Sequence, residues 1–335
     1  MLKIALESLG CSKNLVDAEI MMGILNKKGY KLVGDFEEAD IILVNTCGFI
    51  ESAKQESIQT ILELAQLKET ANLKLLIVTG CLAQRYAEEL KEEIPEIDAI
   101  VGTGSYQQID EIIANLEKEN HIVSLNDIDF AYNEDLPRYV STPDYMAYLK
   151  IGEGCDNKCT YCIIPYARGG KVRSRDLESI VSEVEKLVLN GYKEVVLTGI
   201  HVASYGKDVR DENINLLTVI KAINEINGIE RIRLSSVEPV LFTDEFVNEV
   251  SKMEKVCPHY HLSLQSGCDE TLKRMNRRYT TKEYKEIVDR LRENIPNVAI
   301  TTDVIVGFPG ETNDEFNKTY EFLKEIELSQ MHVFK

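Results

Sequence analysis

The sequence predicts an α/β protein with two domains, a doubly wound parallel sheet followed by an open, partial (β/α)6 barrel. Apolar runs rich in β-branched residues alternate with helical patterns along the 335 residues, as in parallel sheets that helices cover. A segment without periodicity, which contains Pro137 and Pro143, interrupts the alternation. The second half holds six strand and helix units, fewer than the eight of a closed barrel.

The first half supplies the strands of the doubly wound sheet. Its predicted strands are Lys3–Ser8, Ile41–Thr46, Leu73–Thr79 and Ala99–Gly102. Helical spacing follows the first strand, with Ser12 as the expected N-cap and Gly29 as the stop. We expect a first domain over residues 1–123, a linker over 124–144 and a second domain over 145–335.

The second half supplies the strands of the barrel. Its predicted strands are Met146–Ile151, Glu194–Thr198, Arg231–Ser235, Tyr260–Leu264, Ala299–Gly307 and Gln330–Lys335. The chain stops in or just after the sixth strand, so we expect the last helix and anything beyond it to be absent.

The charge is unevenly distributed. The net charge is -18, and residues 1–150 carry 13 Lys and Arg against 26 Asp and Glu, whereas the remainder carries 25 against 30. The first part, at -13, would repel bare nucleic acid and attract a basic protein. The alternative is an acidic surface that only keeps the protein in solution.

The start of the chain lacks the features of a signal peptide, and no apolar run is long enough to span a bilayer. Eight cysteines in a composition of this kind favour thiolate ligands over disulfides, because cytosolic thiols are kept reduced. We therefore predict a cytoplasmic protein without a membrane partner.

The most informative motif is GEGCDNKCTYC, which contains Cys155, Cys159 and Cys162. Three thiolates so spaced can hold three corners of a 4Fe-4S cluster, and the next cysteine is only Cys257. One iron would then be open to a small molecule. A zinc site, which usually shows paired C-x-x-C knuckles, and three unrelated buried cysteines are the alternatives.

A second set of cysteines follows strands of the first half. Cys11, Cys47 and Cys81 each lie one to three residues beyond a predicted strand, and the carboxyl ends of parallel strands meet at one edge of a sheet. Helix N-termini beside them would favour thiolates. Alternatively, these are small apolar residues at strand ends.

Several motifs resemble the radical S-adenosylmethionine (SAM) methylthiotransferase family over almost the whole chain. They are SLGCSKNLVDAE, VNTCGFIESAK, VTGCLAQRY, EGCDNKCTYCIIP, HLSLQSGCDETLKRMNRRYT and TTDVIVGFPGET. The resemblance implies two 4Fe-4S clusters, one in each domain, and SAM as cofactor.

By this resemblance, Cys155, Cys159 and Cys162 bind the cluster whose open iron holds SAM, and its reduction starts radical chemistry. No residue is then expected to act as a general acid or base. The first-half cysteines would hold an auxiliary cluster from which sulfur is delivered. Tyr161 takes the aromatic place before the last cysteine.

One turn and two strand ends are further predicted cofactor contacts. Gly307–Glu311 would let backbone amides approach the adenine, or form an ordinary turn. Glu238 and Gln265 end barrel strands, at the face where barrel ligands bind, or are simply polar strand ends.

Three arginines follow the cysteine motif, and the second half also contains histidines and two further cysteines. Arg168, Arg173 and Arg175 would contact substrate or cofactor, or be solvated. The remaining candidates are expected to be structural or plain thiols: His201, His259, His261, Cys257 and Cys268.

The two halves resemble different branches of the family. The first half and LPRYVSTP resemble the branch that modifies an aspartate of ribosomal protein uS12. From about Tyr166, motifs such as VVLTGIHVASYG resemble the branch that thiolates threonylcarbamoyladenosine in tRNA, and a QDTT-like segment expected of the first branch is absent. The acidic first domain suits a basic ribosomal protein better, so uS12 is the predicted partner and tRNA the alternative.

The resemblance also implies an electron donor such as flavodoxin or ferredoxin, iron-sulfur assembly proteins, and a TRAM domain missing beyond residue 335. Functions of other classes remain open: a non-catalytic iron-sulfur redox protein, or a radical enzyme acting on a small molecule. A third, a sulfur-free radical methyltransferase, is disfavoured by the three strand-end cysteines.

Overall fold

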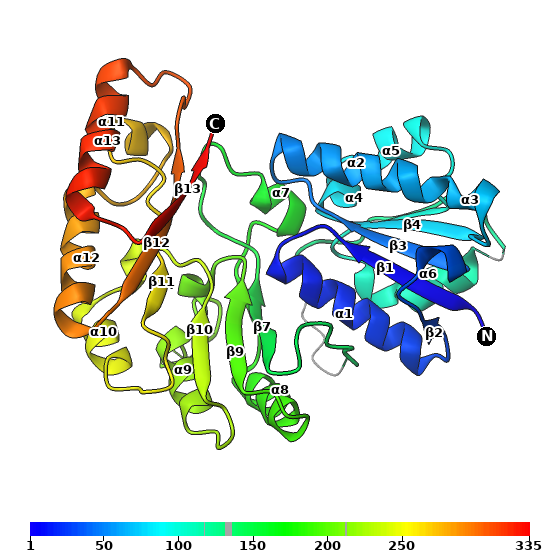
Figure 1. Cartoon of the computed structure of the whole chain (residues 1–335), viewed down its shortest axis with the longest axis horizontal. Coiled ribbons are helices and arrows are strands. Elements are labelled where there is room, and N and C mark those ends of the chain that lie inside the picture. Colours follow the sequence, from blue (N-terminus) through cyan, green and yellow to red (C-terminus); the bar gives the residue numbers. More distant parts are fainter. Residues whose placement is uncertain (117, 131–135, 212) are drawn as a thin grey trace. The chain divides into compact units, whose positions relative to one another are not determined.

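A computed structural model describes residues 1–116, 118–130, 136–211 and 213–335 (Figure 1). The described chain forms two compact units. The first contains residues 1–142 and 163–173, and the second contains 143–162 and 174–335. Residues 131–135 of the predicted linker lie outside the described residues. The segment 163–173 belongs to the first unit although it lies inside the sequence range expected for the second domain.

The first unit is built on a six-stranded parallel sheet in the order β2-β1-β3-β4-β5-β6. Its strands are β1 (Lys3–Ser8), β2 (Lys31–Leu32), β3 (Ile41–Thr46), β4 (Leu75–Gly80), β5 (Ala99–Val101) and β6 (Ile122–Ser124). Its helices are α1 (Ser12–Lys27), α2 (Glu51–Ala65), α3 (Leu67–Thr70), α4 (Cys81–Arg85), α5 (Ala87–Glu93), α6 (Ile109–Asn115) and α7 (Ile164–Arg168), with 3-10 turns at Phe36–Glu38 and Tyr106–Gln108. Helices α1 and α6 cover one face of the sheet, and α2 and α4 cover the other (Figure 1). The predicted doubly wound sheet is confirmed.

Burial explains which strands the sequence revealed. All six residues of β3 are buried, because helices cover both of its faces, and the resulting apolar run predicted its bounds correctly. The short strands β2 and β6 lie at the two edges of the sheet and were not predicted. Two or three residues are too few to show a period.

The start of α1 differs from the expectation. Cys11, not Ser12, occupies the N-cap with extended backbone angles, and Ser12 is the first helical residue. The N–H of Leu15 donates to the carbonyl of Cys11 at 3.0 Å, which closes the first turn of the helix. The predicted stop is present: Gly29 has a φ of +91° just beyond the helix.

The second unit curls its strands into an open barrel wall. Its strands are β7 (Met146–Glu153), β8 (Arg173–Ser174), β9 (Glu194–Gly199), β10 (Arg231–Leu234), β11 (His259–His261), β12 (Ala299–Ile305) and β13 (Gln330–Phe334). They form sheets in the orders β10-β9-β7-β8 and β11-β12-β13. A parallel bridge between Val237 and Leu262 connects the two sheets. All six predicted strands are present, and the open partial barrel is confirmed.

Helices lie along the outer side of this wall (Figure 1). They are α8 (Leu177–Leu189), α9 (Leu216–Asn224), α10 (Asp244–Val250), α11 (Asp269–Arg274), α12 (Thr281–Asn294) and α13 (Asn313–Ile326), with 3-10 turns at Val202–Ser204 and Pro239–Leu241. Capping boxes begin three of them: Asn215 with Thr218 at α9, Thr280 with Glu283 at α12, and Thr312 with Glu315 at α13. Each box satisfies backbone N–H groups that the first helical turn leaves without partners.

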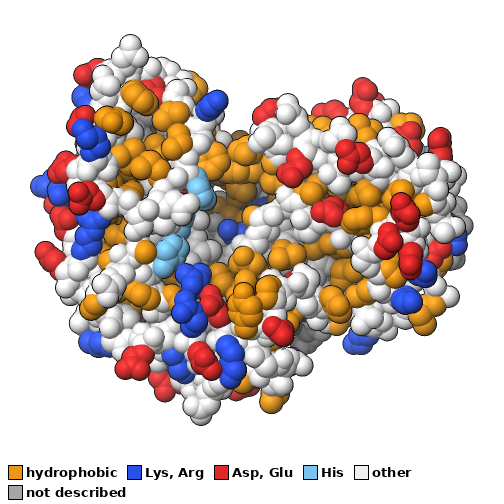
Figure 2. All heavy atoms as spheres, viewed as in Figure 1, with side chains coloured by type: hydrophobic (Ala, Val, Ile, Leu, Met, Phe, Trp, Pro, Cys, Tyr) orange, Lys and Arg blue, Asp and Glu red, His pale blue; other side chains and the backbone are white. Residues whose placement is uncertain are grey.

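The surface of the first unit carries the acidic charge that the sequence predicts. On the face drawn in Figure 2, Asp and Glu side chains are distributed across this unit, at the right of the view, with a few Lys and Arg among them. Among the described residues, no helix is both long and apolar enough to cross a membrane.

Candidate functional site

The three cysteines of the first unit lie at one edge of its sheet. Cys11 precedes α1, Cys47 directly follows β3, and Cys81 begins α4 directly after β4. Strands β1, β3 and β4 are adjacent and parallel, so their carboxyl ends point to the same edge. The thiols are close enough to influence one another: burial raises the pKa of Cys81, Arg168 opposes this increase, and the charges of Cys11 and Cys47 add to it. The structure thus brings together the three residues that the sequence singled out.

The same burial opposes the predicted ease of thiolate formation. Burial also raises the pKa of Cys47 above its ordinary value, and Cys11 adds to this. Metal binding displaces the thiol proton, so protonated thiols in the free protein are compatible with metal ligation. Within the described residues, no three His, Cys, Asp or Glu side chains could hold a single metal ion. A 4Fe-4S cluster is a larger body whose cysteines each bind a different iron.

Gly80 shapes the turn that leads into Cys81. Its φ is +95°, and a Cβ there would lie 2.5 Å from the carbonyl oxygen of Thr46 and 2.6 Å from Oδ1 of Asn45. Hydrogen bonds connect the same strand ends: the Thr46 hydroxyl donates to the Thr79 carbonyl at 2.5 Å, and the Thr79 hydroxyl donates to Asn45 Oδ1 at 3.2 Å. Only glycine fits this close approach of two strand ends.

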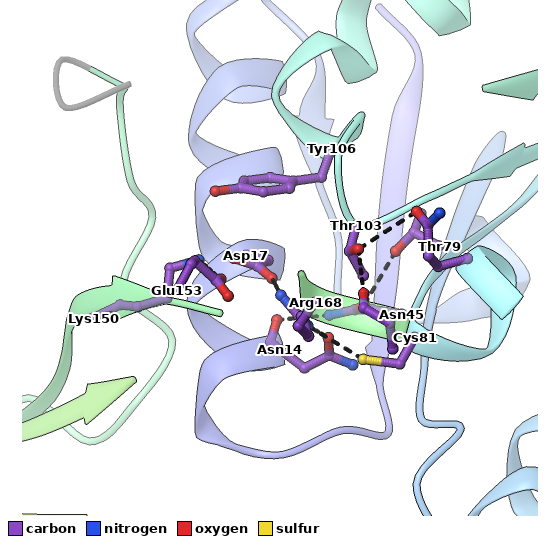
Figure 3. Close-up of polar contacts among 12 residues, drawn as sticks. Asn14, Asp17, Asn45, Thr79, Cys81, Thr103, Tyr106, Lys150, Glu153 and Arg168 are labelled. Carbon is purple, nitrogen blue, oxygen red and sulfur yellow. Dashed lines mark hydrogen bonds and ion pairs between the residues drawn. The ribbon is translucent and has the colours of Figure 1, made fainter. Parts of the chain in front are cut away.

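Arg168, at the end of α7, is buried beside Cys81 (Figure 3). Its Nε donates to the sulfur of Cys81 at 3.3 Å. The same guanidinium forms an ion pair with Asp17 and donates to Oδ1 of Asn14, both on α1. The side chains of Arg168 and Asp17 are only 2% and 5% exposed. Arg168 therefore contacts the cysteine set from within the protein interior and is not solvated.

The other two predicted arginines bind protein groups. Arg173 pairs with Asp129 at 2.8 Å and donates to the carbonyl of Arg168 at 3.1 Å, which fixes the segment 163–173 within the first unit. Arg175 pairs with Glu183 on α8, and its Nε donates to the hydroxyl of Ser179 at 3.0 Å. Contacts of either arginine with substrate or cofactor stay predictions.

The three cysteines of the second unit follow β7 and lie close together. Burial raises the pKa of Cys155 to about 11, and Cys162 and Cys159 add to it through their charges. The chain between α11 and α12 holds this loop in place. The N–H of Thr160 donates to the carbonyl of Met275 at 3.2 Å, and Asn276 Nδ2 donates to the carbonyl of Lys158 at 2.7 Å.

Arg277, in the same connecting segment, was not predicted as a site residue. Its Nη1 donates to the sulfur of Cys159 at 3.2 Å, and its Nη2 pairs with Glu238 at 2.7 Å. Its Nε donates to the hydroxyl of Tyr279 at 3.0 Å, and the Arg277 side chain is 5% exposed. Glu238, a predicted cofactor contact, thus lies beside the cysteine loop and holds Arg277. No local sequence pattern could predict this contact, because Arg277 and Cys159 are 118 positions apart.

Tyr161 and the Gly307–Glu311 turn also lie together. The rings of Tyr161 and Phe308 meet edge to face with centroids 6.2 Å apart. Glu311 folds back on its own turn, where its carboxylate accepts the N–H of Gly307 at 2.5 Å and that of Phe308 at 3.3 Å. Burial raises the pKa of Tyr161. The turn is therefore preformed next to the cysteine loop.

Gln265 adopts an uncommon backbone conformation, with a φ of +71°. Its N–H donates to the carbonyl of Asp303 at 2.9 Å, and its carbonyl accepts the N–H of Ile305 at 2.8 Å, so neighbouring β12 fixes the conformation. Residues other than glycine in this region store strain, which concentrates at functional sites. This supports the prediction that Gln265 contacts a ligand.

The histidines and the last two cysteines have protein partners or are buried. His201 interacts with the hydroxyl of Ser204 at 2.5 Å, and burial lowers its pKa. His261 lies 3.1 Å from Asp303, and His259 lies 3.4 Å from the hydroxyl of Thr301. The buried cysteines are Cys257 and Cys268. None of the eight cysteines, all of which are described, forms a disulfide.

Comparison with known proteins identifies the family of the chain. Residues 3–102 match the family "Uncharacterized protein family UPF0004", and residues 149–323 match the "Radical SAM superfamily". Ribosomal protein uS12 methylthiotransferase RimO of Clostridioides difficile is 56% identical over 334 residues, which cover 100% of this chain and 75% of that protein. This chain belongs to the RimO family. RimO proteins of Geotalea uraniireducens and Clostridium perfringens are 48% and 47% identical over 99% of the chain and 74% of their own length.

These RimO matches include both halves of the chain. The second half, whose motifs resemble the tRNA branch, therefore lies within the range aligned to the RimO relatives. Two solved structures share the fold: the radical SAM methyltransferase TsrM of Kitasatospora setae, with a TM-score of 0.71 at 13% identity, and the cobalamin-dependent SAM radical enzyme OxsB, at 0.64 and 15%. TsrM covers 100% of this chain and 73% of its own, and OxsB 96% and 52%.

Proposed function

We propose that this protein is a radical SAM methylthiotransferase that adds a CH3-S group to an aspartate of ribosomal protein uS12. The observation that carries the proposal is the 56% identity to a uS12 methylthiotransferase along the whole chain. The two three-cysteine sets support it, because each offers sulfur ligands for a 4Fe-4S cluster and leaves one iron without a protein ligand. The acidic charge of residues 1–150 suits a basic ribosomal partner.

The donor chemistry of each set fits the implied cofactor. In each unit three thiols lie close together, and one of them accepts a hydrogen bond from a buried arginine. Cys155, Cys159 and Cys162 would hold the cluster that binds SAM, and the three first-unit cysteines would hold the auxiliary cluster. When bound, these groups supply the radical chemistry that activates a C–H bond and the sulfur that is transferred.

The residues of the chain would bind and orient SAM. Tyr161 and the Gly307–Glu311 turn form one side of the cysteine loop, and Gln265 lies at a strand end of the barrel, where barrel ligands bind. Glu238 acts by holding Arg277 and is close enough to the thiols to raise the pKa of Cys155.

The test is anaerobic reconstitution with iron and sulfide, followed by reaction with SAM and a reductant in the presence of a uS12 peptide or a tRNA anticodon stem-loop. We expect mass spectrometry to find an added CH3-S on the peptide aspartate. Modification of the tRNA alone would overturn the substrate and favour the branch that the second half resembles. Intact SAM would favour a non-catalytic redox protein.

Cysteine variants separate the two sets. Cys159→Ala should abolish SAM cleavage, whereas Cys47→Ala should retain SAM cleavage and lose sulfur transfer. Cys257→Ala, which removes a thiol outside both sets, is the matched control and should retain both reactions. Normal sulfur transfer by Cys47→Ala would contradict the two-cluster proposal. Flavodoxin or ferredoxin as electron donor, iron-sulfur assembly partners and a cytoplasmic location belong to the same proposal.

A further inference from the structure

Each cysteine set has one buried arginine that hydrogen-bonds one of its sulfurs. In the first unit, Arg168 donates to Cys81 at 3.3 Å, and in the second, Arg277 donates to Cys159 at 3.2 Å. We propose that these two arginines set the reduction potentials of the two clusters. The inference rests on the proposed function, because it assumes that both sets bind clusters.

The chemistry of the contact gives the direction of the effect. An N–H donor draws electron density from a ligating sulfur, and a positive charge nearby stabilises the extra electron of a reduced cluster. A guanidinium supplies both and stays charged at any pH a protein survives. Both arginine side chains are at most 5% exposed, so water screens their charge little.

Each arginine is also paired with a carboxylate, whose negative charge limits the effect. Arg168 pairs with Asp17, and Arg277 pairs with Glu238. The carboxylate offsets part of the positive charge that acts on the cluster, while other partners of the guanidinium keep its N–H groups directed toward the sulfur. Asn14 contributes in the first unit, and the hydroxyl of Tyr279 contributes in the second. Removing the carboxylate should therefore act opposite to removing the arginine.

The experiment measures the midpoint potential of each cluster by electron paramagnetic resonance during redox titration, without SAM. The full-length variant lacking Cys11, Cys47 and Cys81 isolates the second-unit cluster. In this background Arg277→Met should lower the midpoint potential by about 59 mV, which corresponds to a change of about tenfold in the equilibrium constant for one-electron reduction. Glu238→Gln should raise it, and Arg277→Lys should lie between Arg277→Met and the unsubstituted protein.

The first-unit cluster is isolated by replacing Cys155, Cys159 and Cys162 with alanine. There Arg168→Met should lower the potential, and Asp17→Asn should raise it. The matched controls are Arg278→Gln, at the exposed neighbour of Arg277, and Lys171→Gln, at an exposed position near Arg168. Neither control should shift a potential.

Opposite shifts from the arginine and carboxylate variants support the proposal, because general damage to the fold would not reverse sign. Unchanged potentials, or shifts of the same sign, in variants that retain iron would overturn it and leave the proposed function standing. If an arginine variant loses its iron, the carboxylate variant of the same unit is the test: a raised potential supports the proposal, and an unchanged or lowered potential overturns it. Absence of clusters from the unsubstituted protein would instead overturn the proposed function and this inference with it.

Discussion

Tyr161 and Phe308 meet edge to face, with ring centroids 6.2 Å apart and ring planes at 86°. They come from segments far apart in the sequence, the cysteine loop after β7 and the glycine-containing turn after β12. An edge-to-face pair contributes about 0.5–1.5 kcal/mol beyond the area it buries. The contact holds the proposed adenine-binding turn against the loop that would carry the cluster.

Phe308→Ala removes this contact and should weaken SAM binding. We expect the dissociation constant for SAM, measured by calorimetry on the reconstituted protein, to rise by at most about tenfold, which corresponds to about 1.4 kcal/mol. Phe316→Ala is the matched control, because Phe316 lies partly exposed on α13. Iron content should stay unchanged in both variants. Equal affinities would show that the ring pair does not position the turn.

Gly80 and Gly29 provide a matched pair for the strand-end turn. Both have φ near +90°, but a Cβ at Gly80 would lie 2.5 Å from the carbonyl oxygen of Thr46, whereas one at Gly29 meets nothing within 4 Å. Gly29→Ala should cost about 1 kcal/mol in unfolding free energy for the backbone conformation alone. Gly80→Ala should cost at least about 2 kcal/mol, because the clash adds to it, and should reduce iron bound by the first unit. Chemical denaturation measures the two unfolding free energies. Similar losses of stability in the two variants would contradict the close approach of the strand ends at Gly80.

The uncommon backbone conformation of Gln265 leads to a prediction in which stability and SAM binding change in opposite directions. Gln265→Gly relieves the conformational strain of a φ of +71°, so the unfolding free energy should stay equal or rise by up to about 1 kcal/mol, after allowing for the greater freedom of glycine in the unfolded chain. SAM affinity should fall, since the side chain is lost. Gln265→Ala keeps the strain and should be the less stable of the two variants. A marked loss of stability in the glycine variant would show that the side chain is structural.

The ion pair between Arg274 and Glu315 predicts a pH dependence of stability. Arg274 donates to both carboxylate oxygens of Glu315 at 2.8 and 2.9 Å, and these bonds, with the N–H of Thr312, lower the pKa of Glu315 to about 2. The folded pKa lies below the ordinary value of 4.5. The contribution to stability is therefore fully present above pH 4.5 and is lost as the pH falls toward 2.

Glu315→Gln measures this contribution. The difference in unfolding free energy between this variant and the unsubstituted protein should be constant from pH 5 to 7 and should shrink below pH 4.5, as followed by urea denaturation. Glu293→Gln, at an exposed carboxylate of α12, serves as the control. A difference that does not change with pH would show that the ion pair does not lower this pKa.

The sequence was sufficient where one local pattern decides the structure. The buried apolar run of β3 predicted that strand correctly, and the placement of Cys11, Cys47 and Cys81 after three parallel strands predicted that they would lie together. Arg277 could not be found in this way. Its contact with Cys159 depends on how the segment after α11 folds back across 118 residues. Arg168 was singled out because it follows the cysteine motif, but its partners on α1 come only from the tertiary fold.

The discontinuous first unit has a consequence for biosynthesis. Asp17 obtains its guanidinium partner from Arg168, which the ribosome adds 151 residues later. A buried carboxylate without its partner destabilises a fold by about 3–5 kcal/mol. The first unit therefore cannot complete its folding when its own sheet leaves the ribosome. It has to wait until residues 163–173 have been synthesised, so Cys11, Cys47 and Cys81 reach their final surroundings only after the cysteines of the second unit exist in the same chain.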